Sequence, residues 1–524
     1  MTVEGRGLAA SAIAGVRWNY LGGVTASACS LIVGIVLARV LGPRPYGQVI
    51  IASTIYGCVQ LFVDGGFGQA LIQKQRLETI EIRKTFTWQI VVAAKITGVV
   101  YLFAPWIARQ FHDASAARVV QAMSLMIVIQ SMGLVSAALL RRRMRFKAIQ
   151  SAALVSYLIG YVVVGVPLAF CGAGVWSLVA ASLCQCLLHT LFQYSAVRHS
   201  VVPCFGLPER CVTRFGGTIV ATNLVNWGHG NLDNLAAAQL GPVALGLYGR
   251  ACNFVYQPMS AVVTGLQSVL MATAAKAQER EGLMRDLTLC AIAVVFGVLG
   301  PAYVTFALIP DTAIVGLFGE KWMGILPLAL PLALAMPFYG AHCLLGPILC
   351  GLGRPEKEFW PQAISCGVAA IAFFAAVRIS LAALAWALLG VMLFRFALIA
   401  VFAFRFLGIQ WRKLLAILAK RMVFALAFGA LAWSADQILR APFHLAAGMR
   451  LALLTPFGAA VLGWTIWWAG EVVFGRDAIG FLLSYTHYLP AGYGRQLQIQ
   501  AHRCTRLISM RVDAATVEPR GVTL

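Results

Sequence analysis

Charged side chains are scarce in this sequence, and acidic ones most of all. Only 11% of the 524 residues are charged, and Asp and Glu together number 19. Soluble domains carry about 25% charged residues, whereas this chain is 60% hydrophobic with a mean hydropathy of +0.81. This composition excludes a soluble enzyme, a disordered tail protein and a nucleic-acid binder with a free basic face. It indicates a polytopic inner-membrane-type protein, because an apolar run of about 20 residues can span a bilayer.

The sequence also lacks the patterns of a metal, cofactor or catalytic site. Its 13 cysteines are an odd number, and most stand inside apolar runs without metal-ligand spacing or a disulfide framework. The sequence contains no phosphate-binding glycine loop, paired-carboxylate cluster or histidine-rich metal motif. We therefore expect no cofactor, no metal ion and no catalytic residue, and an enzyme is disfavoured.

Fourteen apolar segments cover most of the chain, and each is long enough to cross a membrane as a helix. None has the alternating pattern of about ten residues that is typical of an outer-membrane strand, so the predicted fold class is all-α. The segments lie near residues 17–40, 46–71, 86–108, 118–140, 148–170, 174–197, 215–238, 248–272, 287–309, 325–350, 359–378, 381–404, 417–439 and 450–474.

Basic residues indicate which loops face the cytoplasm. With the N-terminus inside and each segment crossing once, 30 of the 41 Lys and Arg residues fall on the cytoplasmic side and 9 on the other side. The remaining two, Lys95 and Arg395, fall inside segments. Cytoplasmic loops collect Lys and Arg, so we expect both termini in the cytoplasm. The same rule accounts for most of the net charge of +22 without an anionic partner such as nucleic acid.

A short motif occurs twice, about 200 residues apart. Leu41-Gly42-Pro43 precedes Tyr46-Gly47, and Leu240-Gly241-Pro242 precedes Tyr248-Gly249. The motifs stand at the start of two successive blocks of six segments, an even number, so the blocks share one orientation and form a parallel repeat. The sequence therefore predicts an N-lobe over 1–214 and a C-lobe over 215–410. It also predicts two appended helices over 411–475 and a basic cytoplasmic tail over 476–524.

Two basic residues lie near the middle of apolar segments, Lys95 in the third and Arg395 in the twelfth. A charge at mid-bilayer costs about 2.5–3.5 kcal/mol on insertion scales, so such residues usually face a bundle interior or water. Our hypothesis is that Lys95 and Arg395 face one central cavity and bind an anionic substrate. The alternative for each is a structural ion pair or a side chain that reaches the membrane surface.

The seventh segment is the most polar. At 100° per residue, Asn223, Asn226, Gly230, Asp233 and Asn234 fall in one stripe about 100° wide. The stripe should line a wet cavity, which makes the three Asn residues and Asp233 candidate substrate-binding groups, or form hydrogen bonds between helices. Asp233 is also a candidate for a coupling proton or Na⁺, as is Asp64 in the second segment. Asp64 could equally pair with a basic cytoplasmic loop.

Four stretches carry a family pattern: Ala38 to Pro43 with Tyr46-Gly47; Asp64 to Gln73; Asn231 to Asn234 with Leu240-Gly241 and Leu245 to Tyr248; and Leu317 to Trp322. Together they resemble the lipid-linked oligosaccharide flippases of the polysaccharide transporter group. That group belongs to a superfamily that also holds multidrug exporters and the lipid II flippase. The sequence departs from the pattern in its C-terminal tail and at Ala236-Ala237-Ala238, where bulkier residues and often an Arg are expected.

The resemblance implies a two-lobed bundle around a central cavity that opens to each side in turn. The implied cargo is an undecaprenyl-diphosphate-linked oligosaccharide for exopolysaccharide, capsule or O-antigen synthesis. Implied partners are membrane lipids, a polysaccharide polymerase and glycosyltransferases. Two alternatives remain open: a multidrug exporter of the same superfamily, which should have acidic cavity residues, and a membrane polymerase or ligase, which should have a sizeable outer loop. A scaffold protein would have no use for intramembrane charges.

Overall fold

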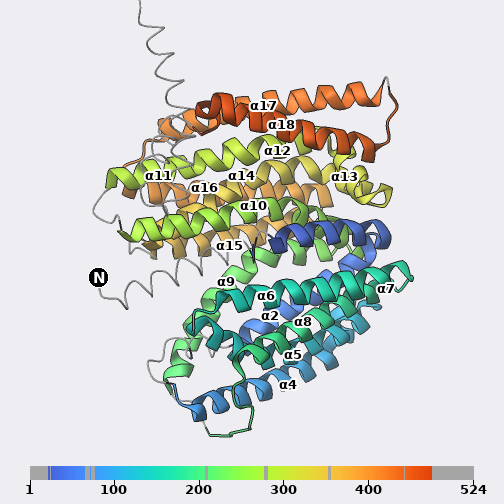
Figure 1. Cartoon of the computed structure of the whole chain (residues 1–524), viewed down its shortest axis with the longest axis vertical. Helices are drawn as coiled ribbons and strands as arrows, with labels where there is room; N and C mark the ends of the chain where they lie inside the picture. The colour runs from blue at the N-terminus through green and yellow to red at the C-terminus, as the bar shows by residue number, and fades with distance from the viewer. Residues whose placement is uncertain are drawn as a thin grey trace, which may run out of the picture. The chain divides into compact units, whose positions relative to one another are not determined.

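The structure is a computed structural model that describes residues 22–23, 25–64, 71, 77–206, 210–276, 281–351, 356–441 and 443–474. The predicted tail over 476–524 lies outside the described residues. Every regular element in the described ranges is helical (Figure 1), which confirms the all-α class. The elements are the helix Thr25–Leu41, α2 (Pro43–Asp64), α4 (Thr79–Gln110), α5 (Ala116–Arg142), α6 (Phe146–Tyr157), η1 (Leu158–Gly165), α7 (Val166–Phe170), α8 (Val175–Val197), α9 (Arg210–Ala238), α10 (Pro242–Lys276), α11 (Glu281–Val294), η2 (Val295–Leu299), α12 (Gly300–Leu308), α13 (Pro310–Phe318), η3 (Glu320–Ile325), α14 (Leu326–Gly351), α15 (Glu356–Ala376), α16 (Leu381–Leu407), α17 (Trp411–Arg440) and α18 (Ala447–Phe474).

Each of the fourteen apolar segments overlaps a helix. Ten of the described helices are long and apolar enough to cross a membrane, and the helices Thr25–Leu41 and Trp360–Ala376 are apolar but shorter. The seventh and eighth segments coincide with α9 and α10, which do not belong to those ten. The protein is therefore a multi-pass membrane protein, while the count of fourteen spans and the direction of each span stay predictions.

The described chain forms two compact units. Unit 1 comprises the described parts of Met1–Gly265, Ile314–Ala335 and Trp360–Phe394, and unit 2 those of Leu266–Ala313, Met336–Phe359 and Arg395–Leu524. These units do not test the predicted lobes over 1–214 and 215–410, and that division stays a prediction.

Unit 1 contains a layer of helices in which α5 packs against α2, α4 and α8 (Figure 1). Small side chains let these helices approach, as is usual in membrane bundles. Gly133 of α5 faces Thr190 of α8, whose Oγ1 would lie 3.0 Å from a Cβ at Gly133. Gly160, in the π-helical segment η1, faces the carbonyl of Ala181 at 2.7 Å by the same measure. Large apolar side chains on the outward faces, such as Leu102 at 76% exposure, fit a lipid environment.

Unit 2 holds the C-terminal helix pair. The helices α17 and α18 run side by side, and α17 also packs along α12 (Figure 1). Gly429 of α17 allows this approach, because a Cβ there would lie 2.7 Å from Val304 and 2.9 Å from Leu308. The pair α17–α18, which the sequence predicts as two appended helices, is therefore packed against the rest of unit 2.

Candidate functional site

The two repeated motifs meet in unit 1, at a crossing where glycine lets the backbones touch. Gly47, in the first turns of α2, lies against the carbonyl of Pro242, and a Cβ at Gly47 would overlap that oxygen. Gly246, in the first turns of α10, lies in the same way against the carbonyl of Pro43. The contact is reciprocal, because each glycine stands four residues after the proline that the other glycine touches. Only glycine fits at either position without a backbone shift.

The segment 316–322 holds the end of the helix Thr25–Leu41 beside this crossing. Trp322, which is fully buried, donates its Nε1–H to the carbonyl of Ala38 at 2.9 Å. Lys321 Nζ donates to the carbonyl of Val40 at 3.2 Å. In return, Arg39 Nε donates to the carbonyl of Leu317 at 2.6 Å and its Nη2 donates to that of Gly316. Carbonyl groups at a helix end need such hydrogen-bond partners. These bonds form a clamp that ties the family stretch Ala38 to Pro43 to the family stretch Leu317 to Trp322.

Arg250 of α10 is a functional candidate that the sequence analysis missed. Its guanidinium lies 4.9 Å from the ring centroid of Phe318 and 5.4 Å from that of Tyr46. It also lies against Gly34, where a Cβ would come within 2.6 Å of Nη2. Among the described residues Arg250 forms no ion pair, and its Nε has no hydrogen-bond partner. Aromatic faces attract a cation but do not neutralise it, so an anion would be stabilised here.

Polar and aromatic groups continue from Arg250 along the same helices. Gln257, two turns further along α10, donates Nε2–H to Ser30 Oγ at 3.0 Å, and Ser30 lies one turn before Gly34. Tyr157 at the end of α6 and Tyr161 in η1 stack their rings with centroids 4.8 Å apart. Amides, hydroxyls and aromatic faces are the groups that bind sugars, so this part of unit 1 has the chemistry of an anionic glycan site.

The structure divides the predicted polar stripe of α9 into two parts. Asn223, Asn226 and Gly230 are exposed and therefore accessible to a ligand. Asp233 is buried and accepts hydrogen bonds from the hydroxyl of Tyr248 at 3.2 Å and from the backbone N–H of Asn234 at 2.8 Å.

Asn234 is half-buried, and its Oδ1 has no hydrogen-bond partner among the described residues. The alanines Ala236, Ala237 and Ala238, where the sequence departs from the family pattern, are at most 2% exposed. Close packing at this end of α9 explains why these residues are small.

The remaining predicted site residues lie on three different helices. Asp64, at the end of α2, is half-buried and accepts a hydrogen bond from Gln60 Nε2 at 2.9 Å. Most of the stretch from Gly65 to Gln73 lies outside the described residues. Lys95 is exposed on α4 in unit 1, whereas Arg395 is 8% exposed on α16 in unit 2. Their approach to one cavity stays a prediction.

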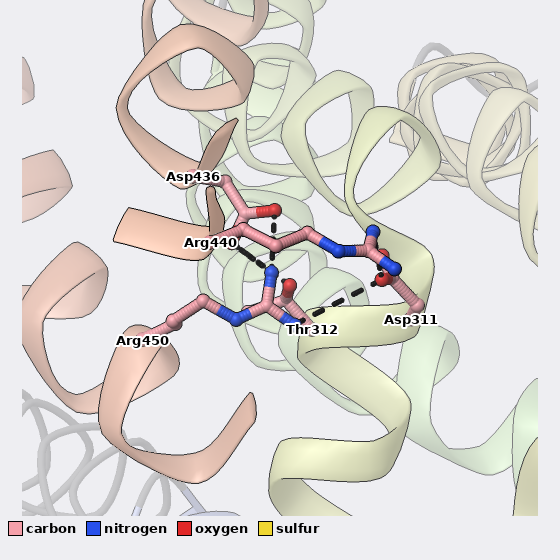
Figure 2. Close-up of polar contacts among 5 residues, drawn as sticks. All are labelled: Asp311, Thr312, Asp436, Arg440 and Arg450. Atoms are coloured by element: carbon pink, nitrogen blue, oxygen red, sulfur yellow. Dashed lines mark hydrogen bonds and ion pairs between the residues drawn. The ribbon is translucent and has the colours of Figure 1, made fainter. Parts of the chain in front are cut away.

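A network of four charged residues and a threonine in unit 2 was also missed (Figure 2). Arg450 at the start of α18 donates to both carboxylate oxygens of Asp436 on α17, at 3.0 and 2.9 Å. Thr312 of α13 donates to Asp436 at 2.8 Å. At the exposed edge, Arg440 pairs with Asp311 at 3.0 Å. The network ties the helix pair α17–α18 to α13, and its charges balance, so it is structural.

Comparison with known proteins places the motifs in a family. The family model described as "Polysaccharide biosynthesis protein" matches residues 36–327, which include both repeated motifs, Arg250 and the clamp up to Trp322. The succinoglycan biosynthesis transport protein ExoT of Rhizobium meliloti (strain 1021) is 25% identical over 347 residues, 66% of this chain and 70% of the relative. The lipopolysaccharide biosynthesis protein WzxC of Escherichia coli (strain K12) is 22% identical over 356 residues, 66% of this chain and 71% of the relative.

Two solved structures share the fold. The lipid II flippase MurJ in an inward closed conformation has a TM-score of 0.67 at 10% identity, over 87% of this chain and 98% of MurJ. An inward-facing multidrug resistance transporter of the MATE family has a TM-score of 0.55 at 14% identity, over 75% of this chain and 95% of that protein. The fold is therefore the one that these two transporters share. Since its model matches more than half of the chain, this protein belongs to the polysaccharide biosynthesis protein family.

Proposed function

We propose that this chain moves a lipid-linked oligosaccharide, in the form of an undecaprenyl-diphosphate-linked repeat unit, across the inner membrane of a bacterium. The polymer made from it would be an exopolysaccharide, a capsule or an O-antigen. The observation that carries the proposal is the family match over 36–327. That range contains the crossing of the repeated motifs and Arg250 beside it. Relatives named for succinoglycan and lipopolysaccharide synthesis support the same class of cargo.

The chemistry around Arg250 suits the head of such a cargo. A diphosphate or an acidic sugar is anionic, and a guanidinium binds phosphate oxygens in a planar, bidentate way. In surroundings of low dielectric constant that attraction is much stronger than in water. Tyr157 and the exposed amides of Asn223 and Asn226 offer stacking and hydrogen bonds to the sugar units. The lipid tail needs no polar site, since it can stay in the bilayer.

Arg395 is a second cationic candidate, because it is a buried cation on a membrane helix. Asp233 and Asp64 stay candidates for a coupling proton or Na⁺. The hydrogen bond between Asp233 and Tyr248 joins α9 to α10, so a change in the charge of Asp233 would alter the packing of these helices beside Arg250. That link favours Asp233 over Asp64 as the coupling group.

A multidrug exporter is the runner-up, because a MATE transporter shares the fold. Cationic drugs need an accessible acidic group, whereas the carboxylate of Asp233 is buried and bonded to Tyr248. The cation near the crossing also repels such drugs. A polymerase or ligase is less favoured still, since it should have a sizeable outer loop, whereas α12, α13 and η3 follow one another closely and α18 begins only a few residues after α17 ends.

The proposal is tested in a strain that lacks the gene, complemented with variants at matched protein abundance. Loss of the chain should stop surface polysaccharide production and cause the lipid-linked intermediate to accumulate. Arg250→Ala should reproduce much of this loss, while Arg250→Lys keeps the charge and should retain more export. Arg378→Ala is the matched control, because Arg378 is exposed in the turn between α15 and α16.

Different results would contradict different parts of the proposal. If the deletion changes drug tolerance but leaves polysaccharide unchanged, the transport function proposed here is wrong and the protein is an exporter of small cations. If Arg250→Ala exports normally, the flippase function stands but the anion site does not lie at Arg250. A fall in polysaccharide without accumulation of the intermediate would place the defect before the flipping step.

A further inference from the structure

Lys95 stands on an exposed face of α4 that has the composition of a lipid-facing surface. This Lys95 face consists of Lys95, Gly98, Val99, Leu102 and Trp106, all of which are exposed. The exposed fractions of Val99, Leu102 and Trp106 are 55%, 76% and 57%. The opposite side of α4 packs on α5 and α2 and buries small residues such as Ala93, Ala104 and Ala108. The lysine therefore points away from the helices that α4 contacts.

The depth of Lys95 follows from two residues on the same face. Lys84 and Trp106 each stand 11 residues away, which is about 16 Å along the axis and within about 20° of Lys95 around it. Lysine and tryptophan favour the membrane surface, and the apolar core is about 30 Å thick. Lys95 thus lies near the midplane. Its side chain of roughly 6 Å cannot bring the ammonium group to either surface.

A charge in that position requires a partner, because an ammonium group in hydrocarbon is strongly unfavourable. Among the described residues, Lys95 forms no hydrogen bond or ion pair. Asp64 and Asp233, the two predicted coupling residues on helices of unit 1, already accept hydrogen bonds from Gln60 and Tyr248. Gly98 leaves open space one turn away, with no atom within 4 Å of a built Cβ, so another backbone can approach closely.

We propose that the Lys95 face is a docking surface for a spanning helix of another membrane protein that carries an Asp or Glu at mid-membrane depth. Charge complementarity decides the occupant. A second copy of this chain that docked through the same face would bring two lysines together and be repelled. A lipid headgroup stays at the membrane surface, about 16 Å away by the helix rise. The inference rests on the membrane-spanning character of the chain and is independent of the cargo.

The test uses the purified full-length protein in phosphatidylcholine vesicles and a defined probe. The probe is a poly-leucine spanning peptide with one central glutamate and a dansyl group, compared with the same peptide that carries glutamine. Association is measured by energy transfer from the protein's tryptophans at low peptide density. We expect the glutamate peptide to bind at least tenfold more tightly than the glutamine peptide. Lys95→Met should remove the difference, and Lys95→Arg should keep it.

Lys84→Met is the matched control, because it removes a lysine from the same side of α4 but at the surface, and it should bind like the wild type. Since Lys95→Met removes a charge from the membrane, the variant should insert and fold at least as well. Equal binding of the two peptides, or unchanged binding to Lys95→Met, would overturn the proposal. So would loss of the difference on adding the anionic lipid phosphatidylglycerol, which would assign the lysine to lipid.

Discussion

A Cβ at Gly246 would stand 3.1 Å from the backbone nitrogen of Gly47, so the two glycines hold α2 and α10 in direct backbone contact. Each glycine belongs to one copy of the repeated motif. The reciprocal contacts with Pro43 and Pro242 give the crossing a local twofold character, as expected where two copies of one motif meet, while the repeat of whole lobes stays a prediction. Because Arg250 lies one turn beyond Gly246, the crossing also sets the position of the cation.

Alanine at either glycine should break this contact. In Gly47→Ala or Gly246→Ala the added methyl group overlaps a carbonyl, and overpacking of this kind costs about 1–3 kcal/mol or more. We expect a lower thermal midpoint in detergent and reduced polysaccharide export in both variants. Gly390→Ala is the control, because a Cβ there has open space on α16. Equal midpoints for all three variants would show that the backbones do not touch.

The indole of Trp322 should matter through its N–H group. Trp322→Phe keeps an aromatic ring beside Tyr46, whose centroid is 5.5 Å away, but removes one of the two donors to the buried carbonyl of Ala38, which also accepts from the backbone N–H of Gly42 at 3.3 Å. The loss of one buried hydrogen bond costs about 0.5–1.5 kcal/mol. We expect a clear fall in the thermal midpoint, and little change for Trp411→Phe, since Trp411 is 42% exposed. A midpoint equal to that of the wild type would mean that the clamp does not depend on this bond.

The sequence was sufficient for the fold class and for the approximate position of the long apolar helices, because long apolar runs in a chain with few charges leave little alternative. It did not predict α13 or η3, which lie between the ninth and tenth apolar segments. It was less informative about helix ends. The eighth apolar run starts at 248, whereas α10 starts at Pro242. Arg250 therefore stands at the very edge of the predicted segment, where a basic residue is ordinary, but two turns inside the helix. The sequence feature that could have identified Arg250 is its position directly after Tyr248-Gly249, the end of the second motif.

Side-chain networks between segments that are far apart in the chain could not be predicted from the sequence. Thr312 and Asp436 are 124 residues apart, and no pattern in the sequence around either residue pairs them. The stripe on α9 shows the same limit. Periodicity placed Asn226 and Asp233 on one face, but only packing against Tyr248 determines that Asp233 is covered while Asn226 is exposed.

The network in Figure 2 contains a buried and an exposed ion pair that should respond differently to mutation. Arg450→Ala leaves the 1%-exposed carboxylate of Asp436 without its partner, and breaking a buried pair in this way costs about 3–5 kcal/mol. Arg440→Ala removes an exposed pair worth about 0–1 kcal/mol. We expect Arg450→Ala to lower the thermal midpoint and expose the α17–α18 link to protease, with Arg440→Ala near the wild type. The reverse order would contradict the geometry.

The turn between α4 and α5 should make stability depend on pH through Asp113. Burial by itself would raise the pKa of this carboxyl, but hydrogen bonds from Ser115 and Gln48 and the charge of Arg44 outweigh it and hold the pKa below its usual range. Gln48 Nε2 donates to Asp113 at 2.7 Å, which ties the turn to α2. Because the pKa is lower in the folded state, the stabilisation is present above the unfolded pKa of about 3.9 and is lost as the pH falls through the folded pKa.

Asp113→Asn should therefore be less stable than the wild type at pH 7 by about 1–2 kcal/mol, since it loses charge-assisted hydrogen bonds but keeps an acceptor. The difference should begin to shrink near pH 4 and vanish below the folded pKa of Asp113, where the wild-type carboxyl is protonated as well. Thermal midpoints in detergent from pH 3 to pH 8 check this, with Asp286→Asn as a control because Asp286 is exposed. A difference that persists unchanged at pH 3 would mean that Asn fails for reasons of shape, and the charge of Asp113 would then carry no stabilisation.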